Sequence, residues 1–178
     1  MKNIATFKIN SKAEKIQAER YGSDESIREV QVGSIKMGGG NPVVVQSMCS
    51  TDTRDIEATL AQVHRLEAAG CEVVRVAVPD EEASAALPDI VKGSNVPIVA
   101  DIHFHYKRAL EAVEAGVSKV RINPGNIGSP DRVKSVVDAC GTAGIPIRIG
   151  VNSGSMPDDI LDKDNYIVTP AGMVEAAG

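Results

Sequence analysis

The chain has 178 residues, enough for one domain with a substantial core, and 43% of them are hydrophobic. Its net charge of -5 leaves no broad basic surface for a nucleic-acid backbone. No apolar run approaches the roughly 20 residues that span a bilayer, and the basic N-terminus lacks the apolar stretch of a signal peptide. We therefore expect a cytoplasmic protein that binds neither nucleic acid nor a membrane.

The three cysteines, Cys49, Cys71 and Cys140, lie far apart in the sequence and form no CxxC pair. An odd number of isolated cysteines supports neither a disulfide framework nor a self-contained metal site. We expect Cys71 and Cys140 to be small residues of the core.

Residues 1–28 are polar and show no sustained hydrophobic period, so we treat them as an N-terminal extension. The following segment, 30–42, has two short apolar stretches around Gly33-Ser34 and predicts a small hairpin at the start of the domain.

From residue 43 onward, short apolar runs alternate with amphipathic segments. Asp55 is a candidate N-cap, Gly70 a candidate stop signal, Pro88 a residue that should kink or split its helix, and Pro130 a first-turn proline. Strands are predicted at 43–48, 71–79, 96–104, 117–125 and 145–152, and helices at 56–69, 80–93, 106–116 and 130–144, with the opening of a fifth at 169–178.

This alternation is typical of βαβ units with a parallel sheet. Three helices end in AAG, EAG and TAG, and the next strand carries an arginine shortly after each glycine. A repeat of about 25 residues fits one βα unit of a (β/α)₈ barrel. Such a barrel takes eight units and about 250 residues. We therefore expect a partial TIM barrel of five units over 29–178, with a doubly wound open sheet as the alternative.

Polar side chains recur in the later half of successive strands. Residues two apart in a strand share a face, which pairs Asp101 with His103 and Arg121 with Asn123. Arg75 occupies the matching place on the second strand, and Arg148 and Asn152 share a face of the fifth. In barrels and in open α/β sheets alike, ligands bind at these carboxyl ends.

The arginines at these strand ends outnumber the carboxylates. Arg75, Arg121 and Arg148 face only Asp101, and buried cations need compensating charge. The purely structural interpretation is that each arginine is an ion-pair partner inside the barrel. A polyanion would balance the surplus, and arginine binds phosphate in a bidentate manner, so we predict a phosphate or diphosphate pocket.

The neighbouring polar residues leave alternatives open. His103 suits a hydrogen-bond or proton donor to an anion better than a metal ligand, whereas Asn123 either caps backbone groups or contacts the ligand. Gln46 and Ser47 close the first strand, so one of them is expected to face the pocket.

In the segments VVVQSM, VRVAVP, VADIHFHY, VRINPGNIG and IPIRIGVNSGS, the sequence resembles the 4-hydroxy-3-methylbut-2-en-1-yl diphosphate synthase family from about residue 30 to the end. The resemblance implies a TIM barrel akin to that of dihydropteroate synthase. It also implies an iron–sulfur oxidoreductase that reductively opens methylerythritol cyclodiphosphate, in the methylerythritol phosphate route to isoprenoids. The expected substrate-binding residues are then Arg75, Asp101, His103, Arg121, Asn123, Arg148 and Asn152.

The same resemblance places a [4Fe–4S] cluster in a C-terminal domain, held by three cysteines and a glutamate. Cys49, Cys71 and Cys140 do not match those ligands, so we expect this chain to bind no cluster or other metal, to supply no catalytic residue, and to be inactive alone. Ferredoxin or flavodoxin is the implied electron donor, and a homodimer or another form of self-association is expected.

Two other functions fit the same pattern. One is a pteroate-synthase-type enzyme on the same scaffold, although no pterin-binding pattern is recognisable. The other is a non-catalytic half-barrel with structural arginines, which pairs with itself to cover its open edges.

Overall fold

The computed structural model describes residues 28–152, 154, 156, 158–163 and 167–177. The predicted N-terminal extension, residues 1–28, lies outside the described residues except for Arg28.

The described chain begins with the predicted hairpin. Strands β1 (Val30–Val32) and β2 (Ile35–Met37) pair antiparallel, with Val32 opposite Ile35, and Gly33 takes a φ of 57° in the turn. A Cβ at Gly33 would lie 2.9 Å from both Pro97 Cγ and Ser118 Oγ. Because these two residues come just before strands of the main sheet, the hairpin packs against the amino ends of the strands. Val32 is completely buried there.

The rest of the chain alternates strands and helices. The strands are β3 (Gln46–Met48), β4 (Val73–Val78), β5 (Ile98–Ile102), β6 (Lys119–Ile122) and β7 (Ile147–Ile149). The helices are α2 (Ile56–Ala68), α3 (Glu81–Gly93), α4 (Tyr106–Glu114), α5 (Pro124–Ile127), α6 (Pro130–Ala143), α7 (Asp158–Lys163) and α8 (Pro170–Ala177).

The helix boundaries follow the predicted signals. The Asp55 carboxylate accepts a hydrogen bond from the Ala58 N–H at 2.9 Å and so caps α2. Pro130 lies in the first turn of α6. The predicted stop residues Gly70, Gly116 and Gly144 all have positive φ, the conformation that ends a helix and favours glycine.

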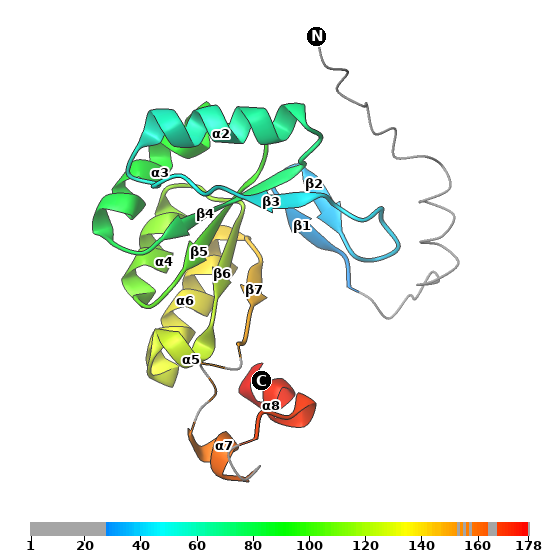
Figure 1. Cartoon of the computed structure of the whole chain (residues 1–178), viewed down its shortest axis with the longest axis vertical. Helices are drawn as coiled ribbons and strands as arrows, with labels where there is room; N and C mark the ends of the chain where they lie inside the picture. The colour runs from blue at the N-terminus through cyan, green and yellow to red at the C-terminus, as the bar shows by residue number, and fades with distance from the viewer. Residues whose placement is uncertain (1–27, 153, 155, 157, 164–166, 178) are drawn as a thin grey trace.

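The main sheet is entirely parallel, and its strand order is β3-β4-β5-β6-β7. A doubly wound sheet reverses its order after the first strand, whereas a barrel adds each strand beside the previous one. Figure 1 shows α2, α3, α4 and α6 along one side of this sheet. The fold is therefore five consecutive units of a (β/α)₈ barrel, and the doubly wound alternative is wrong.

The two faces of the sheet differ in chemistry. The helix-facing side is apolar and packs into the core with residues such as Leu87, Ile90 and Val136. Its strand members are Val74, Val76, Val78, Ile98, Ala100, Ile102, Val120 and Ile122, all of them buried. The alternate residues point to the opposite face, which is the inside of the barrel arc.

Some predicted boundaries need correction. α3 runs unbroken across Pro88, so the proline does not split it. β6 ends at Ile122, earlier than predicted, because the Asn123 side chain accepts the Gly125 N–H at 3.1 Å and starts the short helix α5. β7 covers only the middle of its predicted range.

In the described sheet, β3 and β7 each have one neighbouring strand, so each leaves one backbone edge without a strand partner in the sheet. In the part of the chain that the structure describes, no helix has the length and apolar character of a membrane span.

Candidate anion pocket at the strand ends

The predicted polar residues of the strands lie in two neighbouring rows across the inward face of the sheet. By strand register, Ala77 lies beside Asp101, Asp101 beside Arg121, and Arg121 beside Arg148. These four residues form one row across β4, β5, β6 and β7, whereas Arg75 lies beside Val99, one pleat nearer the amino ends than predicted. The row lies toward the carboxyl ends of the strands, where barrels bind ligands.

Asp101 is the centre of this row. Its carboxylate lies 3.1 Å from Arg121 Nη1, 3.4 Å from Arg75 Nε and 3.9 Å from His103 Nε2. Its side chain is only 6% exposed, while that of His103 is 35% exposed. One buried carboxylate therefore organises two arginines and lies close to a histidine whose ring still reaches solvent.

Arg121 is also fixed from the neighbouring strand. Its Nη2 donates to the Gly150 carbonyl at 3.4 Å, and a Cβ at residue 150 would lie 2.6 Å from its Nε. The guanidinium therefore lies directly over the Gly150 backbone, in space that any side chain at 150 would occupy. Glycine here sets the position of an arginine of the row.

The remaining predicted residues differ in surroundings. Arg148 is exposed next to Arg121, and Asn152 is exposed just beyond β7. Asn123 is buried and caps α5, which matches the capping alternative left open by the sequence. Thus Arg75, His103 and Arg121 each contact Asp101, Arg148 lies beside Arg121 in register, and the two asparagines come just after β6 and β7.

Sequence reasoning missed Lys119. This residue lies two positions before Arg121 in β6 and points to the same face, although the whole residue is buried. Its Nζ lies 3.4 Å from Gln46 Oε1 and 3.6 Å from Met37 Sδ. Burial lowers the pKa of Lys119, and the charges of Arg148 and Arg75 lower it further. The sequence did contain a signal for Lys119. In the segment KVRIN it precedes Arg121 by two residues, the same spacing that pairs Arg121 with Asn123 on one face.

The inward face is consequently cationic. Within the described strands, Arg75, Lys119, Arg121 and Arg148 share that face with the single carboxylate of Asp101. Unpaired buried cations are costly, and a bound anion would compensate them. The predicted surplus of positive charge is present and is larger than the sequence analysis proposed.

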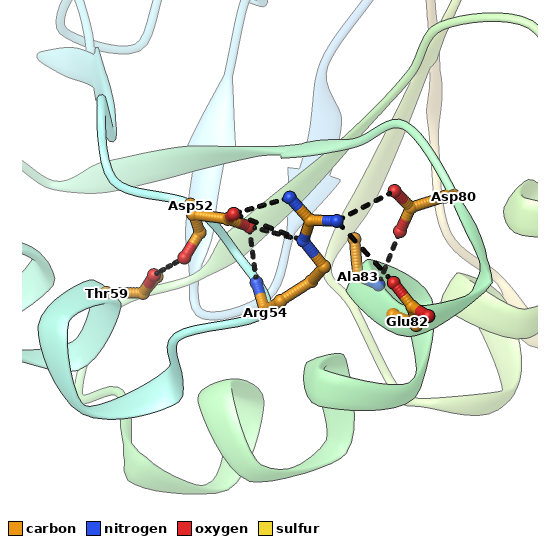
Figure 2. Close-up of polar contacts among 6 residues, drawn as sticks. All are labelled: Asp52, Arg54, Thr59, Asp80, Glu82 and Ala83. Carbon is orange, nitrogen blue, oxygen red and sulfur yellow. Dashed lines mark hydrogen bonds and ion pairs between the residues drawn. The ribbon is translucent and has the colours of Figure 1, made fainter.

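An ion-pair network ties together two loops at the same end of the sheet (Figure 2). Arg54, after β3, donates to both Asp52 oxygens, with Nη2 at 2.6 Å from Oδ2. Its Nη1 also lies 3.6 Å from Asp80 and 3.5 Å from Glu82 at the start of α3. Arg54 lowers the pKa of Asp52. The loops after β3 and β4 are thus held to each other at the rim.

The three cysteines do not form a metal centre. Cys49, Cys71 and Cys140 are all buried in the hydrophobic core, which confirms the prediction for Cys71 and Cys140 and adds Cys49 to it. Burial raises the pKa of the Cys49 and Cys140 thiols, which disfavours the thiolate that iron requires. No group of three or more potential ligands from His, Cys, Asp and Glu occurs among the described residues. These residues do not fit an iron–sulfur cluster.

Comparison with known families agrees with the fold. The family model of the GcpE TIM-barrel domain matches residues 27–178. The chain belongs to the GcpE TIM-barrel family. This match covers all five βα units and the predicted site residues.

Curated relatives share more than half of the aligned residues. The 4-hydroxy-3-methylbut-2-en-1-yl diphosphate synthase (flavodoxin) of Geobacillus thermodenitrificans (strain NG80-2) is 58% identical over 150 residues, covering 84% of this chain and 40% of that protein. The Bacillus anthracis protein of the same name is 57% identical, with 84% and 41% covered. The chain thus spans about two fifths of the length of the relatives it matches.

Solved structures support the same fold. A dihydropteroate synthase of Xanthomonas albilineans superposes with a TM-score of 0.53 at 17% identity, covering 85% of this chain and 58% of that one. At this identity the likeness concerns the barrel alone.

Proposed function

We propose that this GcpE TIM-barrel chain binds the diphosphate of methylerythritol cyclodiphosphate at the carboxyl ends of β4 to β7. The observation that carries the proposal is the contact of the Asp101 carboxylate with Arg75 and Arg121, together with the further cations Lys119 and Arg148 on the same face. The name of the relatives specifies a diphosphate product, which agrees with a site for phosphate oxygens.

In this proposal each residue has a distinct task. Asp101 holds Arg75 and Arg121 in place, aided by Met48 Sδ at Arg75 and the Gly150 carbonyl at Arg121, so that the two guanidinium groups receive the anion already positioned. Arg148 adds charge from the open side, and His103 donates a hydrogen bond to the ligand. Asn123 and Asn152 are proposed to contact its hydroxyl groups. The pocket would contribute positioning and electrostatic stabilisation while the ring C–O bond breaks.

The redox part of the reaction is proposed to lie outside the described residues. A [4Fe–4S] cluster would supply the electrons, received from flavodoxin or ferredoxin, in the cytoplasm. Because Cys49, Cys71 and Cys140 do not fit a cluster, we propose that this chain alone does not turn over the substrate. Turnover by the chain alone, with reconstituted cluster and reductant, would overturn that proposal.

A second candidate is a non-catalytic barrel domain in which the arginines are structural. The two ion pairs of Asp101 favour it, because they already satisfy part of the charge of Arg75 and Arg121. Lys119 and Arg148 disfavour this candidate, because neither forms an ion pair with a carboxylate of the residues that the structure describes. A pteroate-synthase-type activity is supported only by a likeness of fold.

Calorimetric titration with methylerythritol cyclodiphosphate tests the proposal. We expect one site per chain whose affinity falls as salt increases, because charged groups supply the binding. Absence of heat at saturating ligand, with a folded protein, would contradict the proposed function.

A further inference from the structure

Lys119 lies inside the barrel arc on the inward face of β6. The whole residue is only 6% exposed, and burial lowers the pKa of its ammonium. Its two polar neighbours, the Gln46 amide oxygen at 3.4 Å and the Met37 sulfur at 3.6 Å, are uncharged. Within the described part of the chain, it forms no ion pair with a carboxylate.

The charged groups around Lys119 mostly repel it. Arg75 on β4 and Arg148 on β7 are close enough to lower its pKa, and Arg121 follows it on β6. The negative charge on the inward face of the described strands comes from the Asp101 carboxylate on β5. This carboxylate already contacts Arg75 and Arg121. His103, also on β5, contacts the same carboxylate.

This arrangement does not serve stability. A buried ammonium with long, neutral hydrogen-bond partners is costly, and a methionine of the same length would avoid the desolvation. The fold keeps a cation where an apolar side chain would pack better. Retention of such a group is most simply explained by a charge that arrives with a ligand.

We propose that Lys119 is a further anion-binding residue of the strand-end pocket, which presents its ammonium from the floor of the arc to an oxygen of the bound diphosphate. This inference rests on the proposed function, because it needs an anion in the pocket. It adds a second cation to the row one pleat nearer the amino ends of the strands, where Arg75 already lies by register. The hairpin residue Met37 and the β3 residue Gln46 support the ammonium from below.

The alternative is that Lys119 is structural and joins β6 to the hairpin through Met37 and to β3 through Gln46. The two roles predict opposite effects on stability. A structural lysine stabilises the fold, so its removal lowers the melting temperature. A ligand-binding lysine costs stability in the free protein, so its removal raises the melting temperature while weakening anion binding.

The test compares Lys119→Met with the wild-type chain, using inorganic diphosphate as the calorimetric probe. We expect the variant to bind about tenfold more weakly, the factor for one lost charge-assisted contact. We also expect it to melt at a higher temperature than the wild type. Lys134→Met is the matched control, because Lys134 is an exposed lysine, 71% accessible, on α6 and pairs with Asp138. It should change neither affinity nor melting temperature appreciably.

The outcomes separate the two proposals. If the wild-type chain does not bind diphosphate, the proposed function fails. If the wild type binds and Lys119→Met binds within twofold, only the role of Lys119 is overturned. A lowered melting temperature with unchanged affinity establishes the structural role instead. Should Lys119→Met fail to fold, Lys119→Gln gives the same comparison with a polar side chain in the same place.

Discussion

At the scale of single residues, the buried Lys119 ammonium should make stability depend on pH. Burial and the charges of Arg148 and Arg75 lower its pKa in the folded chain, whereas the unfolded chain has the ordinary lysine value of about 10.4. Between those two pKa values the unfolded state binds more protons than the folded state. Stability contributed through Lys119 therefore rises with pH across that window.

The measurement is the free energy of unfolding of the wild-type chain and of Lys119→Met at several pH values from 7 to 10. We expect the variant to be more stable at pH 7 and its advantage to shrink as the pH approaches 10. Asp101, His103 and the three arginines of the inward face are common to both proteins, so their contributions cancel in the difference, as do those of the thiols. An advantage that stays constant with pH contradicts a lowered pKa at Lys119.

Individual site residues could be predicted where the strand period alone decides their direction. Arg75, Asp101 and Arg121 come together because alternate strand residues share a face and parallel strands end at one edge. The direction of the Asn123 side chain could not be predicted, because the cap of a four-residue helix depends on local backbone geometry. Lys119 was missed in the sequence analysis. Only its position two residues before Arg121 in β6, and not its residue type, indicates that it belongs to the pocket.

At the scale of elements, β7 positions a residue of β6. Gly150, just after β7, leaves the space that the Arg121 guanidinium occupies, since a Cβ there would lie 2.6 Å from Nε. We expect Gly150→Ala to displace Arg121 from Asp101 and to weaken cyclic diphosphate binding about tenfold, by the loss of roughly one charge-assisted contact.

Calorimetric titration of Gly150→Ala checks this expectation, and Gly141→Ala is its control. Gly141 lies in α6 with open space at its Cβ, so alanine there should leave affinity unchanged and stabilise the helix slightly. Equal affinity for both variants would show that Arg121 does not need its place over Gly150.

Helices and strands were predictable because glycine and proline signals mark the ends of each unit. Asp55, Gly70, Gly116, Pro130 and Gly144 all act as expected. Pro88 did not split α3, because the apolar face of that helix packs into the core on both sides of the proline, with Leu87 and Ile90 completely buried. Tertiary packing there outweighs the lost backbone hydrogen bond.

At the scale of the whole molecule, the outer strands of the described sheet are candidate surfaces for self-association. β3 and β7 are the outer strands of the described sheet, and Val43, Val45 and Ile149 near them are exposed apolar residues. We propose that copies of the chain pair at these edges, and we expect sedimentation velocity to show dimers or larger species at tens of micromolar.

A charge on the edge strand should reduce this association. We expect Ile149→Lys to shift the chain toward monomer, whereas Val137→Lys, an exposed position on α6, should not. A chain that is monomeric at all concentrations, or equal behaviour of the two variants, is incompatible with pairing at β7.

The strand order explains why the barrel could be predicted from sequence. In a barrel each βα repeat adds one strand beside the last, which gives the observed order β3-β4-β5-β6-β7, whereas the doubly wound alternative needed the structure to exclude it. The place of the hairpin could not be predicted, because it depends on Gly33 fitting against Pro97 and Ser118, residues distant in the sequence.

The sharpest test of the anion pocket is the titration with methylerythritol cyclodiphosphate repeated on Arg121→Ala, with Arg65→Ala, at an exposed arginine of α2, as the control. We expect binding to be lost in Arg121→Ala and unchanged in Arg65→Ala, while Arg121→Ala still unfolds cooperatively. If Arg121→Ala binds the cyclic diphosphate as the wild type does, or if it loses stability while the wild type shows no binding at all, the arginines are structural and there is no diphosphate pocket at these strand ends.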